Sequence, residues 1–226
     1  MRNENITDEE RYYYGKEKHH SFTYLDRIFL SRYMELPIFD KIKRIIKEDD
    51  CCLWYISELI NIYYLAQYQS RLKGSFAEIG TFHGTSSAVI AEAKGDNPFY
   101  TIDSFEGLLD ASEGDNINFH SGTYPSSYTT TKQRLSRYKD IHILKGFFPR
   151  DTSVTNITDK YKYSFVHLDC DTYSSIYNSL KYFKERMVEG GIILLHDYPE
   201  SEGCKRAANQ HFKVIQINFN QGVIFI

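Results

Sequence analysis

The sequence predicts an α/β fold, with helices on both faces of a doubly wound, mostly parallel sheet of seven strands. From residue 75 onward, short apolar runs alternate with helical segments, which is typical of parallel strands joined by crossover helices. Near the end, Asn220-Gln221-Gly222 joins two close apolar runs and indicates an antiparallel hairpin. Helical periodicity fills most of residues 24–69, so we also expect a helical N-terminal layer packed on the sheet.

The helical layer carries three apolar stripes, and the third, which starts at Leu53, is the longest. Asp50 is expected to cap the helix that carries this stripe. A layer of this thickness cannot enclose a core of its own. We therefore expect residues 1–74 to form a helical arm or lid, and residues 75–226 to form the ligand-binding domain.

The apolar runs and the helical segments between them place the remaining elements. We expect strands over residues 76–79, 99–103, 141–144, 165–169 and 191–195, followed by the two hairpin runs 212–218 and 222–226. Helices are expected over residues 85–94, 131–138, 174–187 and 202–210, with Gly190-Gly191 ending the third. Residues 106–130 form a polar loop without periodicity, and loops of this length usually carry function or are disordered.

Composition narrows the class of protein and its partners. The chain has 226 residues, is 42% hydrophobic and carries a net charge of −3, which gives no general attraction to nucleic acid or to an anionic membrane. No apolar run reaches the roughly 18 residues that span a bilayer. The polar N-terminus lacks the apolar core of a signal peptide, and the four cysteines show no metal spacing, so we expect a cytoplasmic protein. Tyr12, Tyr13 and Tyr14 would suit a homodimer contact.

A glycine-containing turn follows the first predicted strand. That strand ends at Glu78 and runs into a turn with Gly80 and Gly84, and the next strand ends at Asp103, 23 positions after Gly80. Glycines let a ligand approach the backbone, and an acid at the end of the second strand can accept the ribose hydroxyls of a nucleoside. The spacing E-x-G-x-x-x-G differs from the dinucleotide pattern and suits a nucleoside without a pyrophosphate. S-adenosylmethionine is the commonest ligand of that kind.

A cluster of acids follows the fourth and fifth predicted strands. Asp169 and Asp171 stand two positions apart, and His196 and Asp197 follow the next strand. Because parallel strands place their carboxyl ends at one edge of a sheet, these side chains are expected to converge. Converging carboxylates repel one another, which indicates either a bound metal or a carboxyl group with a raised pKa that acts as a base. For Asp171 alone, the role of N-cap of the following helix is an equal alternative.

Several segments resemble the macrocin O-methyltransferase family, the sugar O-methyltransferases of antibiotic biosynthesis. The segments are AEIGTFHG, DSFEGL, LKGFFPRDT, LDCDTYSS, GGIILLHDY and CKRAANQHF, in family order between about residues 75 and 215. The resemblance implies a Rossmann-like domain that transfers a methyl group from S-adenosylmethionine to a small hydroxylated acceptor, such as a sugar. The helical N-terminal region would then lie over the acceptor.

The resemblance also implies roles for individual residues. The family depends on magnesium, which places metal ligands at Asp169, His196 and Asp197, with Asp169 also as the catalytic base; in this chain His196 is an alternative base. Taken with the glycine turn, it predicts that the following residues bind the cofactor: Glu78, Gly80, Thr81, Gly84, Asp103, Ser104, Phe105, Gly146 and Phe147.

One position departs from the family pattern. The family usually has two consecutive aspartates where this chain has His196 and Asp197. Imidazole is a better ligand for manganese, iron or zinc than for magnesium, so the expected cation is Mg²⁺ or Mn²⁺. Two other interpretations stay open. Asp169-x-Asp171 could be the metal-diphosphate motif of a glycosyltransferase, or the chain could bind S-adenosylmethionine without turnover.

Overall fold

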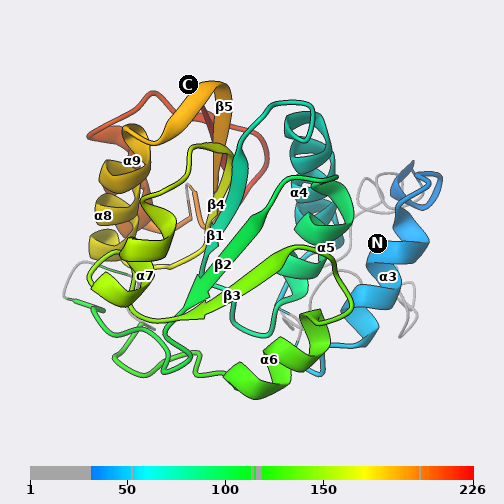
Figure 1. Ribbon diagram of the computed structural model, residues 1–226, viewed down its shortest axis with the longest axis horizontal. Coiled ribbons are helices and arrows are strands. Elements are labelled where there is room, and N and C mark those ends of the chain that lie inside the picture. Colours follow the sequence, from blue (N-terminus) through cyan, green and yellow to red (C-terminus); the bar gives the residue numbers. More distant parts are fainter. Residues whose placement is uncertain (1–31, 52, 113–114, 116–118, 199) are drawn as a thin grey trace, which may run out of the picture.

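The computed structural model describes residues 32–226 except 52, 113–114, 116–118 and 199 (Figure 1). Its sheet has seven strands in the order β3-β2-β1-β4-β5-β7-β6. Strands β1 to β5 are parallel, whereas β7 runs antiparallel to both β5 and β6. This confirms the predicted fold class. The strands are β1 (Ser75–Ile79), β2 (Phe99–Asp103), β3 (Ile141–Lys145), β4 (Tyr163–Leu168), β5 (Met187–Leu195), β6 (Ile215–Gln216) and β7 (Gly222–Phe225).

Helices cover both faces of this sheet (Figure 1). One face carries α3 (Phe39–Lys47), α4 (Ile56–Gln69) and α5 (Thr85–Ala93). The other face carries α7 (Thr152–Thr158), α8 (Tyr173–Lys184) and α9 (Glu202–Asn209), while α6 (Tyr128–Leu135) contacts β3. None of the helices in the described part of the chain is both long and apolar enough to cross a membrane.

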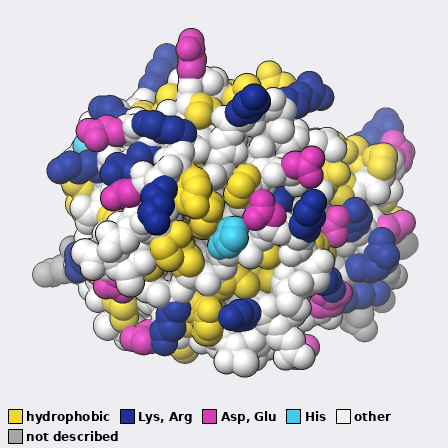
Figure 2. Space-filling view, viewed as in Figure 1, with side chains coloured by type: hydrophobic (Ala, Val, Ile, Leu, Met, Phe, Trp, Pro, Cys, Tyr) yellow, Lys and Arg dark blue, Asp and Glu magenta, His cyan; other side chains and the backbone are white. Residues whose placement is uncertain are grey.

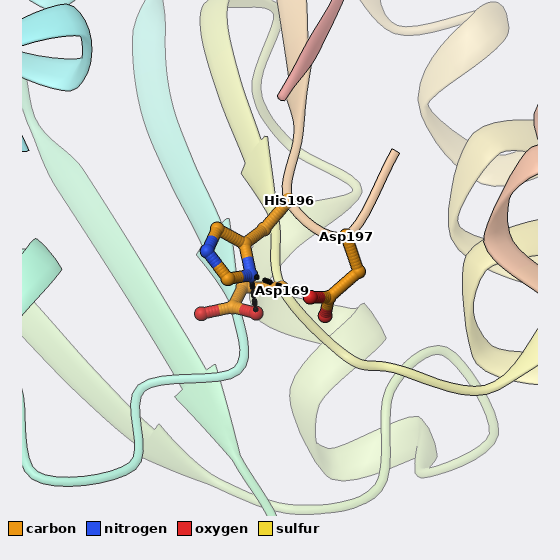
Figure 3. Close-up of side chains that lie close together, drawn as sticks. All are labelled: Asp169, His196 and Asp197. Atoms are coloured by element: carbon orange, nitrogen blue, oxygen red, sulfur yellow. Dashed lines mark ion pairs between the residues drawn. The ribbon is translucent and has the colours of Figure 1, made fainter. Parts of the chain in front are cut away.

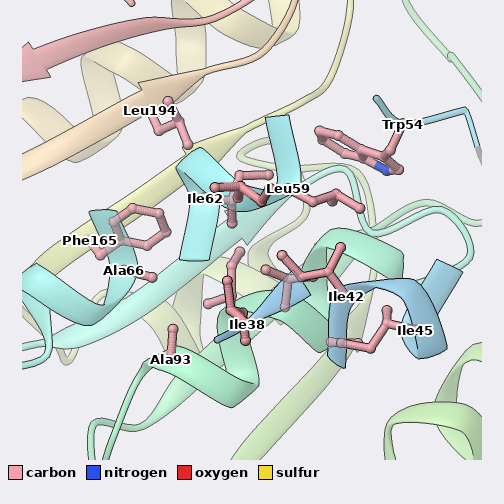
Figure 4. Packing of buried hydrophobic residues seen from close by; sticks show 14 of the residues in the cluster. Ile38, Ile42, Ile45, Trp54, Leu59, Ile62, Ala66, Ala93, Phe165 and Leu194 are labelled. Carbon is pink, nitrogen blue, oxygen red and sulfur yellow. The ribbon is translucent and has the colours of Figure 1, made fainter. Parts of the chain in front are cut away.

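Two hydrophobic cores form because successive strand residues point to opposite faces of the sheet. Phe165 on β4 and Leu194 on β5 belong to the core under α3, α4 and α5 (Figure 4). Their neighbours Val166 and Ile193 belong to the core under α8 and α9. Both strands are therefore buried on both sides, as expected for central parallel strands.

The described part of the N-terminal layer shares its core with the sheet. Ile42 on α3 and Leu59 and Ile62 on α4 are fully buried in the same cluster as Phe165 (Figure 4). The layer from residue 32 onward therefore depends on the sheet for its burial. The role of residues 1–74 as an arm or lid stays a prediction, and Tyr12, Tyr13 and Tyr14 lie outside the described residues.

The start of α4 differs from the prediction. The helix begins at Ile56, with Tyr55 as the N-cap residue, so the expectation that Asp50 caps it is wrong. The backbone N–H of Tyr55 donates to Glu58 Oε2 at 3.0 Å, which satisfies one of the free donors at the helix end. Leu53, which the sequence predicts to be the first residue of the apolar stripe, is exposed. Residues 53–55 form neither helix nor strand, the Tyr55 backbone is extended, and Trp54 lies at the site described below.

The strand β5 is longer than predicted. It starts at Met187, so Gly190-Gly191 lies inside a strand and does not end α8, which stops at Lys184. The pairing of β4 with β5 shifts between Tyr163 and Phe165, and Gly190 has a φ of 76° within the irregularity. The glycine pair therefore lies at a β-bulge, which is a common position for glycine within a strand.

Smaller differences concern helix bounds. The helix α6 begins three residues earlier than expected, because Ser127 accepts a hydrogen bond from the Thr130 N–H and caps it. The short helix α7 was not predicted, and β6 is shorter than the predicted run. Thr172, which accepts from the Ser175 N–H, caps α8, so the alternative role of Asp171 as N-cap is wrong.

Candidate active site

A cavity of about 900 Å³ opens at the carboxyl ends of the parallel strands. Residues after β1, β2, β4 and β5 contribute to its wall, which is where ligands bind in open α/β sheets. Among the sequence-predicted site residues, the wall contains Gly80, Thr81, Asp103, Ser104, Gly146, Phe147, Asp169, His196 and Asp197. The structure thus brings the two predicted clusters, the glycine turn and the acids, to one cavity.

Glycine is required at position 80 because the turn after β1 lies very close to the end of β4. Gly80 has a φ of 95°, and a Cβ there would lie only 1.7 Å from the carbonyl oxygen of Asp169. Any other residue at position 80 would therefore push apart the turn after β1 and the end of β4. Gly84, with a φ of 81°, is the N-cap residue of α5.

Three of the predicted cofactor residues do not line the cavity: Glu78, Gly84 and Phe105. The Glu78 side chain is fully buried beneath the turn. Its carboxylate faces His167 Nδ1 at 2.9 Å and accepts hydrogen bonds from Ser87 and Thr101. In this structure, Glu78 therefore supports the strand that carries the turn, and His167 is its buried partner.

The carboxylate of Asp103 holds the turn from the neighbouring strand. Its two oxygens accept the backbone N–H groups of Phe82 and Phe105, both at 2.7 Å. Burial raises the pKa of Asp103 above its ordinary value, although these hydrogen bonds work in the opposite direction. Each oxygen keeps lone-pair capacity for a ligand, since a carboxylate oxygen can accept two hydrogen bonds.

Asp49 joins the N-terminal layer to the same turn, and sequence reasoning missed it. Its carboxylate accepts the Cys51 N–H at 3.0 Å, lies 2.9 Å from His83 Nδ1 and pairs with Arg134 at 3.5 Å. Burial alone would raise the pKa of Asp49, but hydrogen bonds from Thr85, His83 and the Cys51 N–H, with the Arg134 charge, lower it. The carboxylate is therefore held ionised at the entrance of α5.

The acids predicted to converge do so around an imidazole (Figure 3). His196 Nδ1 lies 3.1 Å from Asp169 Oδ1 and 3.2 Å from Asp197 Oδ1. One donor atom from each residue can be chosen so that all three lie within 4.8 Å of one another, close enough to hold a metal ion. Asp171 and Asp197 both have positive φ values, 60° and 58°, which is uncommon outside glycine and is often found at functional sites.

Charges in this cluster shift one another's protonation. Burial lowers the pKa of His196, but the carboxylates of Asp197, Asp169 and Glu58 outweigh it and raise that pKa well above its ordinary value. Burial and the like charges of Asp197 and Asp169 raise the pKa of Asp171. The His196 charge outweighs burial at Asp197 and lowers its pKa to about 2. The cluster therefore holds mixed charge states in a small volume, as catalytic sites commonly do.

The long loop after β2 is anchored beside the cavity. Asp110 in this loop accepts hydrogen bonds from Thr172 Oγ1 at 2.7 Å and from Ser175 Oγ at 3.0 Å. Asp115 accepts the Tyr173 N–H at 2.7 Å. Two carboxylates therefore tie the loop to the N-terminal turn of α8, where the helix dipole favours negative charge.

The charged side chains on the face of the molecule shown in Figure 2 are mixed in sign. Figure 2 shows lysine and arginine scattered among aspartate and glutamate on the face in view, without one basic patch.

The fold and the cavity define a class: a Rossmann-like α/β protein with a ligand site at the carboxyl ends of its parallel strands. Within it, the sequence profile of the macrocin O-methyltransferase (TylF) family matches residues 64–223. The chain belongs to this family, so it is an O-methyltransferase that uses S-adenosylmethionine as cosubstrate. No curated protein matches the chain.

Solved structures with the same fold are distant in sequence. The calicheamicin methyltransferase CalS11 has a TM-score of 0.69 and 12% identity, over 91% of this chain and 94% of that chain. The O-methyltransferase NovP has a TM-score of 0.63 and 16% identity, over 77% of this chain and 81% of that chain. An O-methyltransferase from Bacillus cereus, in complex with SAH, has a TM-score of 0.60 and 15% identity, over 90% of this chain and 96% of that chain.

Proposed function

We propose that this methyltransferase acts on a small hydroxylated acceptor, in particular a sugar, with the help of a divalent metal. The observation that carries the proposal is the grouping of Asp169, His196 and Asp197 on the wall of the cavity that also contains the glycine turn. A solved structure with the same fold also supports a sugar as the acceptor, since CalS11 is described as a TDP-rhamnose 3'-O-methyltransferase.

The three side chains fit a divalent cation. His196 Nδ1 is buried and makes no well-directed hydrogen bond within the described part of the chain, although two carboxylates face it. A nitrogen lone pair flanked by two carboxylates is a donor set that suits manganese or iron, and also accepts magnesium. When bound there, such a cation supplies Lewis acidity that lowers the pKa of a nearby acceptor hydroxyl.

The chain's own residues must orient the acceptor and remove its proton. The methyl group moves from the sulfonium sulfur to the acceptor oxygen, so one C–S bond breaks and one C–O bond forms. The hydroxyl proton passes to Asp169 or to His196, which lie at the centre of the cluster. Because the sulfonium is already activated, alignment of the two reacting atoms supplies much of the rate enhancement.

The cofactor would lie along the first two strand ends. Gly80 and Thr81 border the methionine part, Asp103 accepts the ribose hydroxyls, and Ser104 and Phe147 border the adenine. Thr81 is buried and hydrogen-bonded to Thr101 at 2.6 Å, so it offers its backbone. This arrangement leaves the acids after β4 and β5 for the acceptor.

The interpretation of Asp169 and Asp171 as the metal-diphosphate motif of a glycosyltransferase does not agree with the family of the chain. The cavity wall, as far as the described residues show it, contains no lysine or arginine to pair with a diphosphate. The interpretation as a protein that binds S-adenosylmethionine without turnover rests only on His196 in place of an aspartate, and membership of an O-methyltransferase family speaks against it.

One experiment separates these functions. The purified protein is titrated with S-adenosylmethionine by calorimetry and then incubated with a panel of sugars and other polyols, with mass spectrometry to detect a methylated product. Methylated sugar supports the proposal. Affinity for nucleotide sugars without affinity for S-adenosylmethionine would point to the glycosyltransferase, and cofactor binding without any product would point to the non-catalytic protein.

A further inference from the structure

His196 is enclosed by residues from three separate parts of the chain. The ring of Trp54, from the segment before α4, lies against it with ring centroids 4.5 Å apart. On the side away from Asp169 and Asp197, the ring nitrogen Nε2 faces Glu58 Oε1 at 3.5 Å and Asn220 Nδ2 at 3.1 Å. The imidazole is therefore fixed on the side opposite to the two carboxylates.

Glu58 has an environment that helix capping alone does not explain. Its side chain is 1% exposed, and one oxygen accepts the Tyr55 N–H as part of the helix start. The other oxygen points toward His196 and accepts Asn220 Nδ2 at 3.1 Å. His196 is the only basic side chain within ion-pair distance of Glu58 among the described residues. A buried carboxylate needs such partners, because burial without them is costly.

We propose that Glu58 is a positioning residue that makes His196 a metal ligand through Nδ1. Coordination by Nδ1 requires a lone pair on that nitrogen and therefore a hydrogen on Nε2. Glu58 Oε1 is the acceptor that such a hydrogen needs. Histidine ligands in metal sites commonly donate their second N–H to a carboxylate, which fixes the tautomer and orients the ring.

Asn220 is compatible with this arrangement. Its amide nitrogen donates to Glu58 Oε1 at 3.1 Å, and it also lies 3.1 Å from His196 Nε2, where the position of the hydrogen depends on the imidazole tautomer. An amide nitrogen cannot accept a hydrogen bond, so when Nε2 carries its hydrogen, the acceptor on that side of the ring is Glu58 Oε1. Asn220 follows β6 and Glu58 lies in α4, so the terminal hairpin and the N-terminal layer both support the metal ligands.

The inference rests on the metal assistance proposed above, and it is tested by metal binding and not by turnover. Mn²⁺ is titrated into the full chain with S-adenosylhomocysteine present, and the complex is examined by pulsed electron paramagnetic resonance for coupling to a nitrogen nucleus. Wild type should show the nitrogen coupling, and His196→Asp should lose it. Binding of Mn²⁺ by wild type without nitrogen coupling would overturn the assignment of His196 as a ligand.

Glu58→Gln tests the positioning role. The glutamine oxygen can still accept the Tyr55 N–H, but its amide group would place a donor opposite His196 Nε2. The affinity for Mn²⁺ should fall by about tenfold to a hundredfold, with little change in thermal unfolding. Glu48→Gln is the matched control, since Glu48 also lies in the N-terminal layer and pairs only at the surface with Arg137.

The outcomes separate this inference from the proposed function. Equal Mn²⁺ affinity in wild type, Glu58→Gln and Glu48→Gln would overturn the positioning role and leave His196 as a ligand. No Mn²⁺ binding by wild type would overturn the whole inference. Methyl transfer to a sugar is measured separately, and its presence or absence decides the proposed function.

Discussion

Asp103 holds the glycine turn in place and also faces the cavity, so a substitution acts on both. Asp103→Ala should weaken the binding of S-adenosylmethionine by about tenfold to a hundredfold, because hydrogen bonds to a charged group contribute roughly 1.5–3 kcal/mol each. Calorimetry measures the affinity, and thermal unfolding reports damage to the turn. Asp103→Asn, which keeps one acceptor for the Phe82 or Phe105 N–H, separates the two effects. Unchanged affinity in Asp103→Ala would exclude the ribose contact.

Asp169 is placed to act as metal ligand, as base, or as both, and each role needs its negative charge. Asp169→Asn should therefore lower the rate of methyl transfer by about 10²–10⁴, while the affinity for S-adenosylmethionine stays near that of wild type. Initial rates at saturating cofactor measure this. Asp159→Asn, which weakens a surface ion pair with Arg186 far from the cavity wall, is the control. Near-wild-type activity of Asp169→Asn after exhaustive chelation would contradict both roles.

The residues that sequence reasoning found and those it missed differ in one physical respect. Asp103, Asp169 and Asp197 follow strands of one parallel sheet, so the topology alone brings them together. Asp49 reaches the cavity wall and Glu58 reaches His196 only because α3 and α4 pack on a particular part of the sheet. No local pattern encodes such a contact, since it depends on side-chain packing between segments far apart in the sequence.

Among the elements, the segment after α3 is joined to the start of α5 through the buried carboxylate of Asp49. Asp49→Asn should lower the free energy of unfolding by about 1–3 kcal/mol at pH 7, since it weakens charge-assisted hydrogen bonds in a buried site. The pKa of Asp49 is lowered in the folded state from an ordinary value of 3.8. Its contribution is therefore present above that value and is lost as the pH falls through the folded-state pKa.

The pH dependence of the difference in unfolding free energy between wild type and Asp49→Asn tests whether the charge of Asp49 contributes. Denaturant unfolding is measured for wild type and Asp49→Asn between neutral and acidic pH, and the difference should shrink as the pH falls below about 4. Asp96→Asn, at an exposed loop position, should show no comparable difference. A difference that stays constant down to low pH would mean that the charge of Asp49 does not contribute.

The loop after β2 depends on its two anchors at α8. Asp110→Ala removes the acceptor for Thr172 and Ser175, so residues 106–127 should be cleaved faster in limited proteolysis. If this loop and residues 1–74 form a lid, S-adenosylhomocysteine with an acceptor should protect both from cleavage in wild type. Asp140→Ala, outside the loop, is the control. Equal cleavage of wild type and Asp110→Ala would exclude the anchor.

Element bounds were predictable where apolar periodicity decides them and not where single hydrogen bonds do. The strand β2 agrees with the prediction because both of its ends coincide with changes in polarity. The helix α4 starts later than expected because the chain before it is extended to place Trp54 beside His196. Gly190-Gly191 was ambiguous, since glycine pairs occur both after helices and in bulges.

At the scale of the molecule, the N-terminal layer and the sheet share one core, so they should unfold together. Leu59 on α4 is fully buried in the cluster that contains Phe76, Phe165 and Leu194. Leu59→Ala should lower the free energy of unfolding by about 2–5 kcal/mol, from lost burial and the cavity left behind. That decrease should apply to the whole chain, because the sheet loses the same contacts as the layer.

Trp54 makes this prediction measurable. It is the single tryptophan of the chain, is 9% exposed and lies in the layer against His196, so its fluorescence reports on the layer and the site. Far-ultraviolet circular dichroism reports on all helices and strands. In both wild type and Leu59→Ala, the two signals should change at the same denaturant concentration, as in a two-state transition. An earlier fluorescence transition in Leu59→Ala, with the dichroism transition unshifted, would show that the layer unfolds as a separate lid.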